Sequence, residues 1–146
     1  MKTNNWRGGI GYIETYSDGT YQPVEDGKKA WIVSVDREVS DLVAWLPNKP
    51  IRWWLRRGIA PILNPEAIER AVHFELPLSV HRTPYQWLAA HRDGIVILDW
   101  RSNIPFWLSG VSRILTQDVH LAKKINSTFS LEIPEIRLES EVRHAA

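Results

Sequence analysis

The pattern of hydrophobic residues changes at Asn64-Pro65, and this change limits the folds open to the chain. Before it, short runs of β-branched and aromatic residues alternate with turn residues, as in GYIETY, KKAWIVSV and LVAWLP. Asp18-Gly19 lies between two such runs and is typical of a hairpin turn. We therefore predict an antiparallel β-meander over residues 10–64.

After Asn64 the sequence alternates helix and strand signals. Asn64 followed by Pro65 indicates a helix start with an Asn cap, and Thr83-Pro84 repeats the signal. The helices expected are 65–72, 84–92 and 104–117, and the strands are 77–82, 94–100, 119–122 and 134–139. Such alternation favours βαβ units with at least one parallel strand pair.

The chain length of 146 residues fits one domain with a sizeable core. The predicted fold class is α+β: an N-terminal antiparallel β-meander that merges into a C-terminal βαβ-type segment in a single compact domain. We expect a flexible arm over residues 1–9, the domain over 10–139 and a frayed tail over 140–146.

Composition excludes several kinds of site. The chain has no cysteine, so it has no disulfide, thiolate zinc site, iron–sulfur cluster or cysteine nucleophile. Its histidines show no metal-binding spacing, and glycine-rich phosphate-binding motifs are absent. We therefore expect no metal and no cofactor. The chain has no signal-like segment and no apolar run of membrane-spanning length, so we expect a cytoplasmic protein without a membrane partner.

The segment IRWWLRRG, residues 51–58, is the most unusual stretch, with adjacent tryptophans, three arginines and no acid. As a strand, it places Arg52, Trp54 and Arg56 on one face. One interpretation is an ordinary solvated strand whose arginines cover Trp54. A second is a protein-docking face, because tryptophan and arginine are enriched at binding hot spots. A third is a single-stranded nucleic-acid platform, where bases stack on the ring and arginines contact phosphates.

Charge is distributed unevenly along the chain. Net charge is only +1, but residues 51–92 carry six arginines against three acids. The nucleic-acid hypothesis predicts that Arg56 and Arg57 share one positive groove with Arg82 or Arg92, with salt-dependent affinity. The protein-docking hypothesis predicts that Trp54 is exposed beside an apolar patch.

Asp99 is the candidate residue for an enzyme. It follows the apolar run IVIL, and ligands of α/β sheets gather beyond the carboxyl ends of parallel strands. His81 ends the preceding predicted strand and is a possible acid–base partner. Asp99 could equally cap the next helix or pair with Arg92 or Arg101. The catalytic site is therefore left unassigned, and we lean against an enzyme.

The stretches DLVAWLP, RWWLRRG and WLAAHRDGIVILDW resemble those of small proteins of bacterial phages and plasmids. The resemblance is to no particular family. It implies an accessory role, such as that of an adaptor or an inhibitor. We predict a non-enzymatic binding protein that docks on a protein partner through its Trp/Arg-rich face. Alternatives are a nucleic-acid-binding module using that face and a small enzyme at Asp99. A homodimer through the helix expected at 104–117 is also possible.

Overall fold

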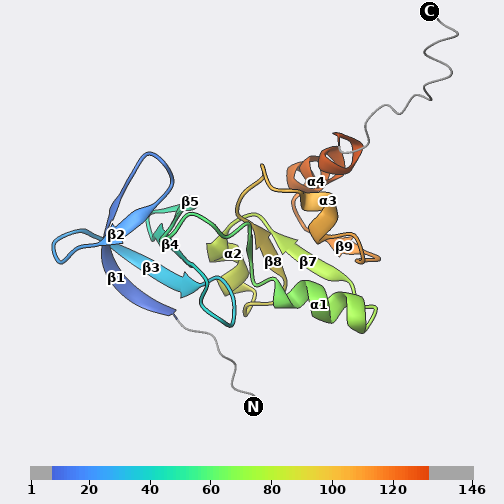
Figure 1. Ribbon diagram of the computed structural model, residues 1–146, viewed down its shortest axis with the longest axis horizontal. Coiled ribbons are helices and arrows are strands. Elements are labelled where there is room, and N and C mark those ends of the chain that lie inside the picture. Colours follow the sequence, from blue (N-terminus) through green and yellow to red (C-terminus); the bar gives the residue numbers. More distant parts are fainter. Residues whose placement is uncertain (1–7, 132–146) are drawn as a thin grey trace, which may run out of the picture.

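Two sheets lie side by side in the structure, a computed structural model that describes residues 8–131 (Figure 1). The first sheet has the order β2-β1-β3-β4-β5, and every neighbouring pair is antiparallel. Its strands are β1 (Gly8–Thr15), β2 (Tyr21–Pro23), β3 (Lys28–Ser34), β4 (Leu42–Leu46) and β5 (Lys49–Leu55). The predicted meander is confirmed over these five strands.

The second sheet is mixed, with the order β6-β8-β7-β9. Its strands are β6 (Ile62–Leu63), β7 (Leu78–His81), β8 (Ile95–Ile97) and β9 (Ile114–Leu115). β7 is parallel to β8 and β9, which confirms the expected parallel pairing, whereas β6 is antiparallel to β8. Residues 62–63 therefore belong to this sheet, although the sequence predicted that the meander continued to residue 64. The fold class is α+β, as predicted.

Both faces of the first sheet carry buried side chains. Along β3 and β4, side chains alternate strictly between two clusters. The inner cluster lies in the concave side of the curled sheet and comprises Ile13, Tyr21, Ala30, Ala44, Leu46 and Trp54. The outer face packs on the second sheet and on α2 (Pro84–Ala89), with Val33, Val43 and Trp45 against Trp87 and Val96. The curled sheet brings β5 next to the β1–β2 turn, where Leu55 donates its N–H to the carbonyl of Gly19 at 2.9 Å.

Helices cover the second sheet. They are α1 (Glu66–His73), α2, α3 (Ile104–Trp107) and α4 (Val119–Leu131). Thr83 caps α2 as predicted, accepting the N–H of Gln86 at 3.1 Å. The predicted cap Asn64 does not cap α1 with its side chain. Its amide instead donates to the carbonyl of Gly94 at 2.9 Å, which joins the start of α1 to the start of β8.

The C-terminal elements differ from their predicted bounds. The helix expected over 104–117 ends at Trp107, because Ser109, Gly110 and Ser112 favour helix poorly and Ile114 pairs with β7. The strand expected over 119–122 is wrong. Those residues begin α4, whose first turn is capped by Asp118 accepting the N–H of Leu121 at 3.1 Å. The arm expected over 1–9 is too long, because β1 begins at Gly8. Residues 1–7, the strand expected at 134–139 and the tail 140–146 lie outside the described residues.

Candidate functional site

β5 is an edge strand of the first sheet, so one side of its backbone faces away from β4. Arg56 donates its N–H to Leu42 of β4, whereas Leu55 donates to Gly19 on the other side. By alternation, the backbone N–H of Trp53 points outward like that of Leu55. The pairing with β4 is irregular between Trp54 and Lys49. The segment singled out in the sequence thus forms an edge strand whose outer side meets the β1–β2 turn at Leu55 and has no strand beside it from Lys49 to Trp54 in the described part of the chain.

Trp54 faces inward. The predicted alternation holds, because Trp53 and Leu55 join the outer cluster and Trp54 the inner cluster. The expectation that Trp54 is exposed is wrong: it is 5% exposed. The physical reason is that the sheet curls, so the face predicted to be wet is the concave side and holds a core of its own. Arg52 lies over the Trp54 ring, with its guanidinium carbon 5.1 Å from the centroid.

The segment that follows β5 is held by the buried side-chain carboxylate of Asp41. Asp41 is 1% exposed and accepts four backbone N–H groups at 2.7 to 3.2 Å. The donors are Leu42, Arg57, Ile59 and Ala60. Arg57 also donates its guanidinium to the carbonyl of Ser40 at 3.2 Å. Sequence reasoning missed Asp41, which reads as one more polar turn residue in DREVSD.

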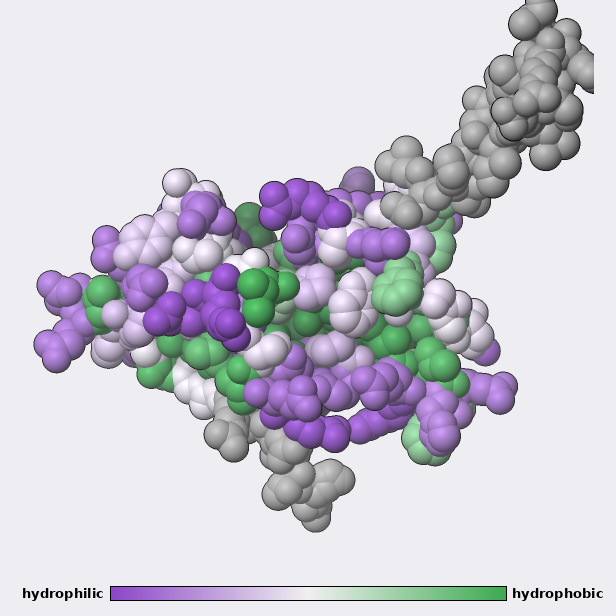
Figure 2. Space-filling model, viewed as in Figure 1, coloured by the Kyte–Doolittle hydropathy of each residue, from purple (hydrophilic) through white to green (hydrophobic). Residues whose placement is uncertain are grey.

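The surface that β5 does present is aromatic and aliphatic on the outer face. Ile51 is 74% exposed and Trp53 is half-buried. On the same face, Ile10 pairs directly opposite Trp31, which in turn pairs opposite Trp45. Ile10 and Tyr12 are 54% and 50% exposed. We call Ile10, Tyr12, Trp31, Ile51 and Trp53 the open surface of the first sheet; its β1–β3 part and its β5 part lie on either side of Trp45 of β4, which is fully buried. Figure 2 shows hydrophobic side chains reaching the surface in the half of the molecule that holds this sheet.

The other predicted arginines lie on different structural elements. Arg82 follows β7 and pairs with Asp118 before α4 at 3.6 Å. Arg92 lies in the connection from α2 to β8, where it lines a cleft beside α1. Arg56 and Arg57 follow β5 in the first sheet, whereas α4 belongs to the half built on the second sheet (Figure 1). The predicted binding residues are thus spread over several elements, and the structure brings Arg52 and Trp54 into contact.

Asp99 follows β8, as predicted, and its carboxylate is engaged locally. It accepts the backbone N–H of Arg101 at 2.9 Å and the guanidinium Nε at 3.1 Å. Partial burial opposes ionisation, but these hydrogen bonds and the positive charge prevail and lower the pKa of Asp99. His81 is bound elsewhere, with its Nε2 2.7 Å from the carbonyl oxygen of Asp93. The structure therefore favours the local pairing with Arg101 that the sequence left open.

Among residues 8–131, no group of three or more His, Cys, Asp or Glu side chains is placed to hold a metal ion. No helix in the same part of the chain is long and apolar enough to cross a membrane. No protein-family model, curated protein or solved structure matches the chain.

Proposed function

We propose that this is a non-enzymatic binding protein that docks on a protein partner through the β5 edge and the part of the open surface that lies on β5, Ile51 and Trp53. The observation that carries the proposal is that β5 is an edge strand, occupied on its outer side by the β1–β2 turn at Leu55, with the exposed Ile51 and the half-buried Trp53 before that point. In monomeric proteins, open hydrophobic edge strands are normally protected by charges, bulges or covering elements, because such edges pair readily with strands of other chains. A partner strand added to this edge gains backbone hydrogen bonds and covers Ile51 and Trp53.

The charge of the edge favours an acidic partner segment. Lys49 and Arg52 lie on β5, and Arg56 and Arg57 follow it, with no acid between residues 49 and 57. The nearest acid bound to this segment, Asp41, is buried and engaged by backbone N–H groups. An extended segment with acidic side chains and alternate apolar residues matches this combination of cations and apolar surface.

Capture from an extract of the native host tests the proposal, followed by titration of the purified partner. The test variant is Ile51→Asp with Arg52→Glu, and the control is Phe106→Asp, which changes a side chain 70% exposed on α3. We expect one protein retained by the wild type and the control and lost with the test variant. Equal retention by all three proteins would contradict docking at β5.

The nucleic-acid alternative has its own experiment. Trp54 presents no free ring for a base, so on the Arg52, Trp54 and Arg56 face this alternative would depend on the arginines. Fluorescence anisotropy of labelled single-stranded and duplex oligonucleotides, with wild type and Arg56→Ala plus Arg57→Ala at two salt concentrations, distinguishes the two. Salt-sensitive binding lost in the double variant would replace the protein partner with nucleic acid.

A further inference from the structure

The sequence that follows α4 has a pattern that matches the β5 edge. Residues 135–142 read EIRLESEV, so apolar or small residues alternate with charged ones. We call residues 135–142 the C-terminal segment. In an extended strand, such spacing separates the two kinds of side chain onto opposite faces. One face would carry Ile136, Leu138, Ser140 and Val142, and the other Glu135, Arg137, Glu139 and Glu141.

β5 has the same division between its two faces. The exposed Ile51 and the half-buried Trp53 lie on its outer face, whereas Arg52 lies over the ring of Trp54 on the other face. Directly opposite residues of paired strands share a face. A strand that places Leu138 beside Ile51 or Trp53 therefore places its acids beside Arg52, whichever way it runs.

Charge and strand length both favour β5 over the other edges. Residues 49–57 carry four cations and no acid, and the C-terminal segment carries three acids and one arginine. Opposite charges on facing strands stabilise their pairing. The remaining edge strands of the described part of the chain are shorter: β2 has three residues, β6 two and β9 two, against seven in β5.

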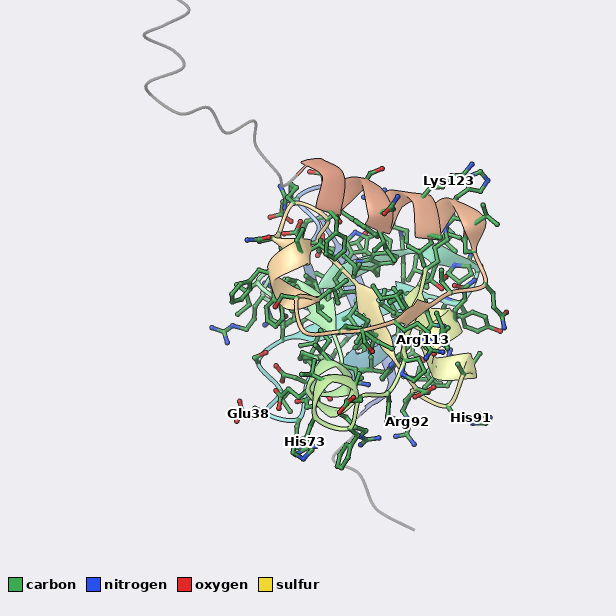
Figure 3. The ribbon with its side chains drawn as sticks, turned by 90° about the vertical axis from the view of Figure 1, so that its right-hand side faces the viewer. Glu38, His73, His91, Arg92, Arg113 and Lys123 are labelled. Atoms are coloured by element: carbon green, nitrogen blue, oxygen red, sulfur yellow. The ribbon has the colours of Figure 1, made fainter. Side chains whose placement is uncertain are left out.

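The position of α4 favours the β5 edge of a second copy. α4 belongs to the half built on the second sheet, and β5 to the other half (Figure 1). Figure 3 shows α4 along the outside of its half, with Lys123 pointing outward. Five Cα–Cα steps join Leu131, the last residue of α4, to Ile136, and they span at most about 18 Å. So short a connection suits exchange between copies better than a return across the same molecule.

We propose that the C-terminal segment of one copy pairs with β5 of a second copy and occupies this edge until an acidic partner displaces it. The inference rests on the proposed function, because it assigns a resting occupant to the same docking edge. Pairing covers Ile51 and Trp53 and gives the outer side of β5 a strand of backbone donors and acceptors. It thereby protects the edge from strands of unrelated proteins.

Disulfide trapping in the full chain tests the pairing, because the sequence contains no cysteine. One copy carries Ile51→Cys, and an isotope-labelled copy carries a single cysteine in the C-terminal segment. A mixed disulfide, identified by its mass, then joins two copies by design. Ile136→Cys and Leu138→Cys test the face assigned to Ile51, and Arg137→Cys and Glu139→Cys are matched controls on the opposite face.

We expect mixed disulfides at Ile136→Cys or Leu138→Cys to form several times faster than in the controls, because a disulfide needs Cβ atoms about 3.5–4.5 Å apart. Equal rates on the two faces would overturn the proposal. Absence of a mixed disulfide at all four positions would also overturn it.

Sedimentation equilibrium of the full chain measures the contribution of charge. Replacing Glu135, Glu139 and Glu141 with Gln should raise the Kd of the dimer at least about tenfold, which corresponds to about 1.4 kcal/mol. The control replaces three exposed glutamates elsewhere, which changes the net charge equally and should leave the Kd unchanged: Glu25→Gln, Glu38→Gln and Glu69→Gln. A wild type that stays monomeric, or equal weakening in both triple variants, would contradict exchange.

The capture experiment distinguishes this inference from the docking proposal. If a host protein is lost with Ile51→Asp and Arg52→Glu but the C-terminal segment forms no mixed disulfide, exchange is overturned and docking at β5 stands. If the mixed disulfides form and no host protein is retained, exchange is supported and the outside partner is the part that fails.

Discussion

Replacing Asp41 should destabilise the whole protein, because its carboxylate joins the start of β4 to the segment after β5. Four backbone N–H groups lose their acceptor in Asp41→Ala. A hydrogen bond to a charged group is worth about 1.5–3 kcal/mol, and an orphaned buried donor costs about 1–3 kcal/mol. Only the N–H of Ala60 is fully buried, so water can replace part of the loss at the other three. We therefore expect a decrease of about 3–5 kcal/mol in the free energy of unfolding.

Asp41→Asn separates the effect of the lost hydrogen-bond acceptor on stability from the effect of the lost side-chain volume. The amide keeps the shape but turns one acceptor oxygen into a donor facing two N–H groups, so we expect a loss of about 2–3 kcal/mol. Urea unfolding followed by tryptophan fluorescence measures both variants. Asp26→Ala is the matched control, an exposed aspartate with no side-chain hydrogen bond in the described structure, and it should stay within about 0.5 kcal/mol of wild type. A loss below about 1 kcal/mol in Asp41→Ala would refute the assigned role.

Three further predictions concern other buried residues. Trp54→Ala should cost about 3–5 kcal/mol in urea unfolding, as expected for a core aromatic rather than a displayed one. Gly94→Ala should cost more than about 1 kcal/mol in the same assay, because φ is +89° and the new Cβ would lie 2.3 Å from the carbonyl oxygen of Ser79. Burial raises the pKa of the Tyr21 phenol to about 12. The unfolded phenol ionises near pH 10, so stability should fall from pH 10 to about 12, and Tyr21→Phe should flatten this decline.

The pattern of the sequence predicted the elements better than it predicted their surroundings. The meander, the capped helix α2 and the parallel pairing of β7 with β8 follow from local signals. Alternation in IRWWLRRG also placed Trp53 and Trp54 on opposite faces. The alternation could not show that side chains are buried on both faces, because burial on the second face depends on the curl of the sheet. The role of Asp41 could not be predicted either, since its hydrogen-bond donors lie up to 19 residues away in the sequence and follow no periodic pattern.

The outer face of the first sheet links the fold to the proposed docking site. At one end of this face, Val33 and Val43 are buried beneath α2 and the second sheet. At the other end, Ile10 and Tyr12 are exposed on the same face, without such a cover within the described part of the chain. The half-buried Trp31 lies between the two ends. It packs against the outer cluster, and it lies directly opposite Ile10 in the pairing of β1 with β3. A partner docking here would therefore extend an apolar core that the chain already builds with α2. Trp53 of β5 packs on the same outer cluster, so the apolar side chains within reach of a partner lie on the outer face rather than at the inward-facing Trp54.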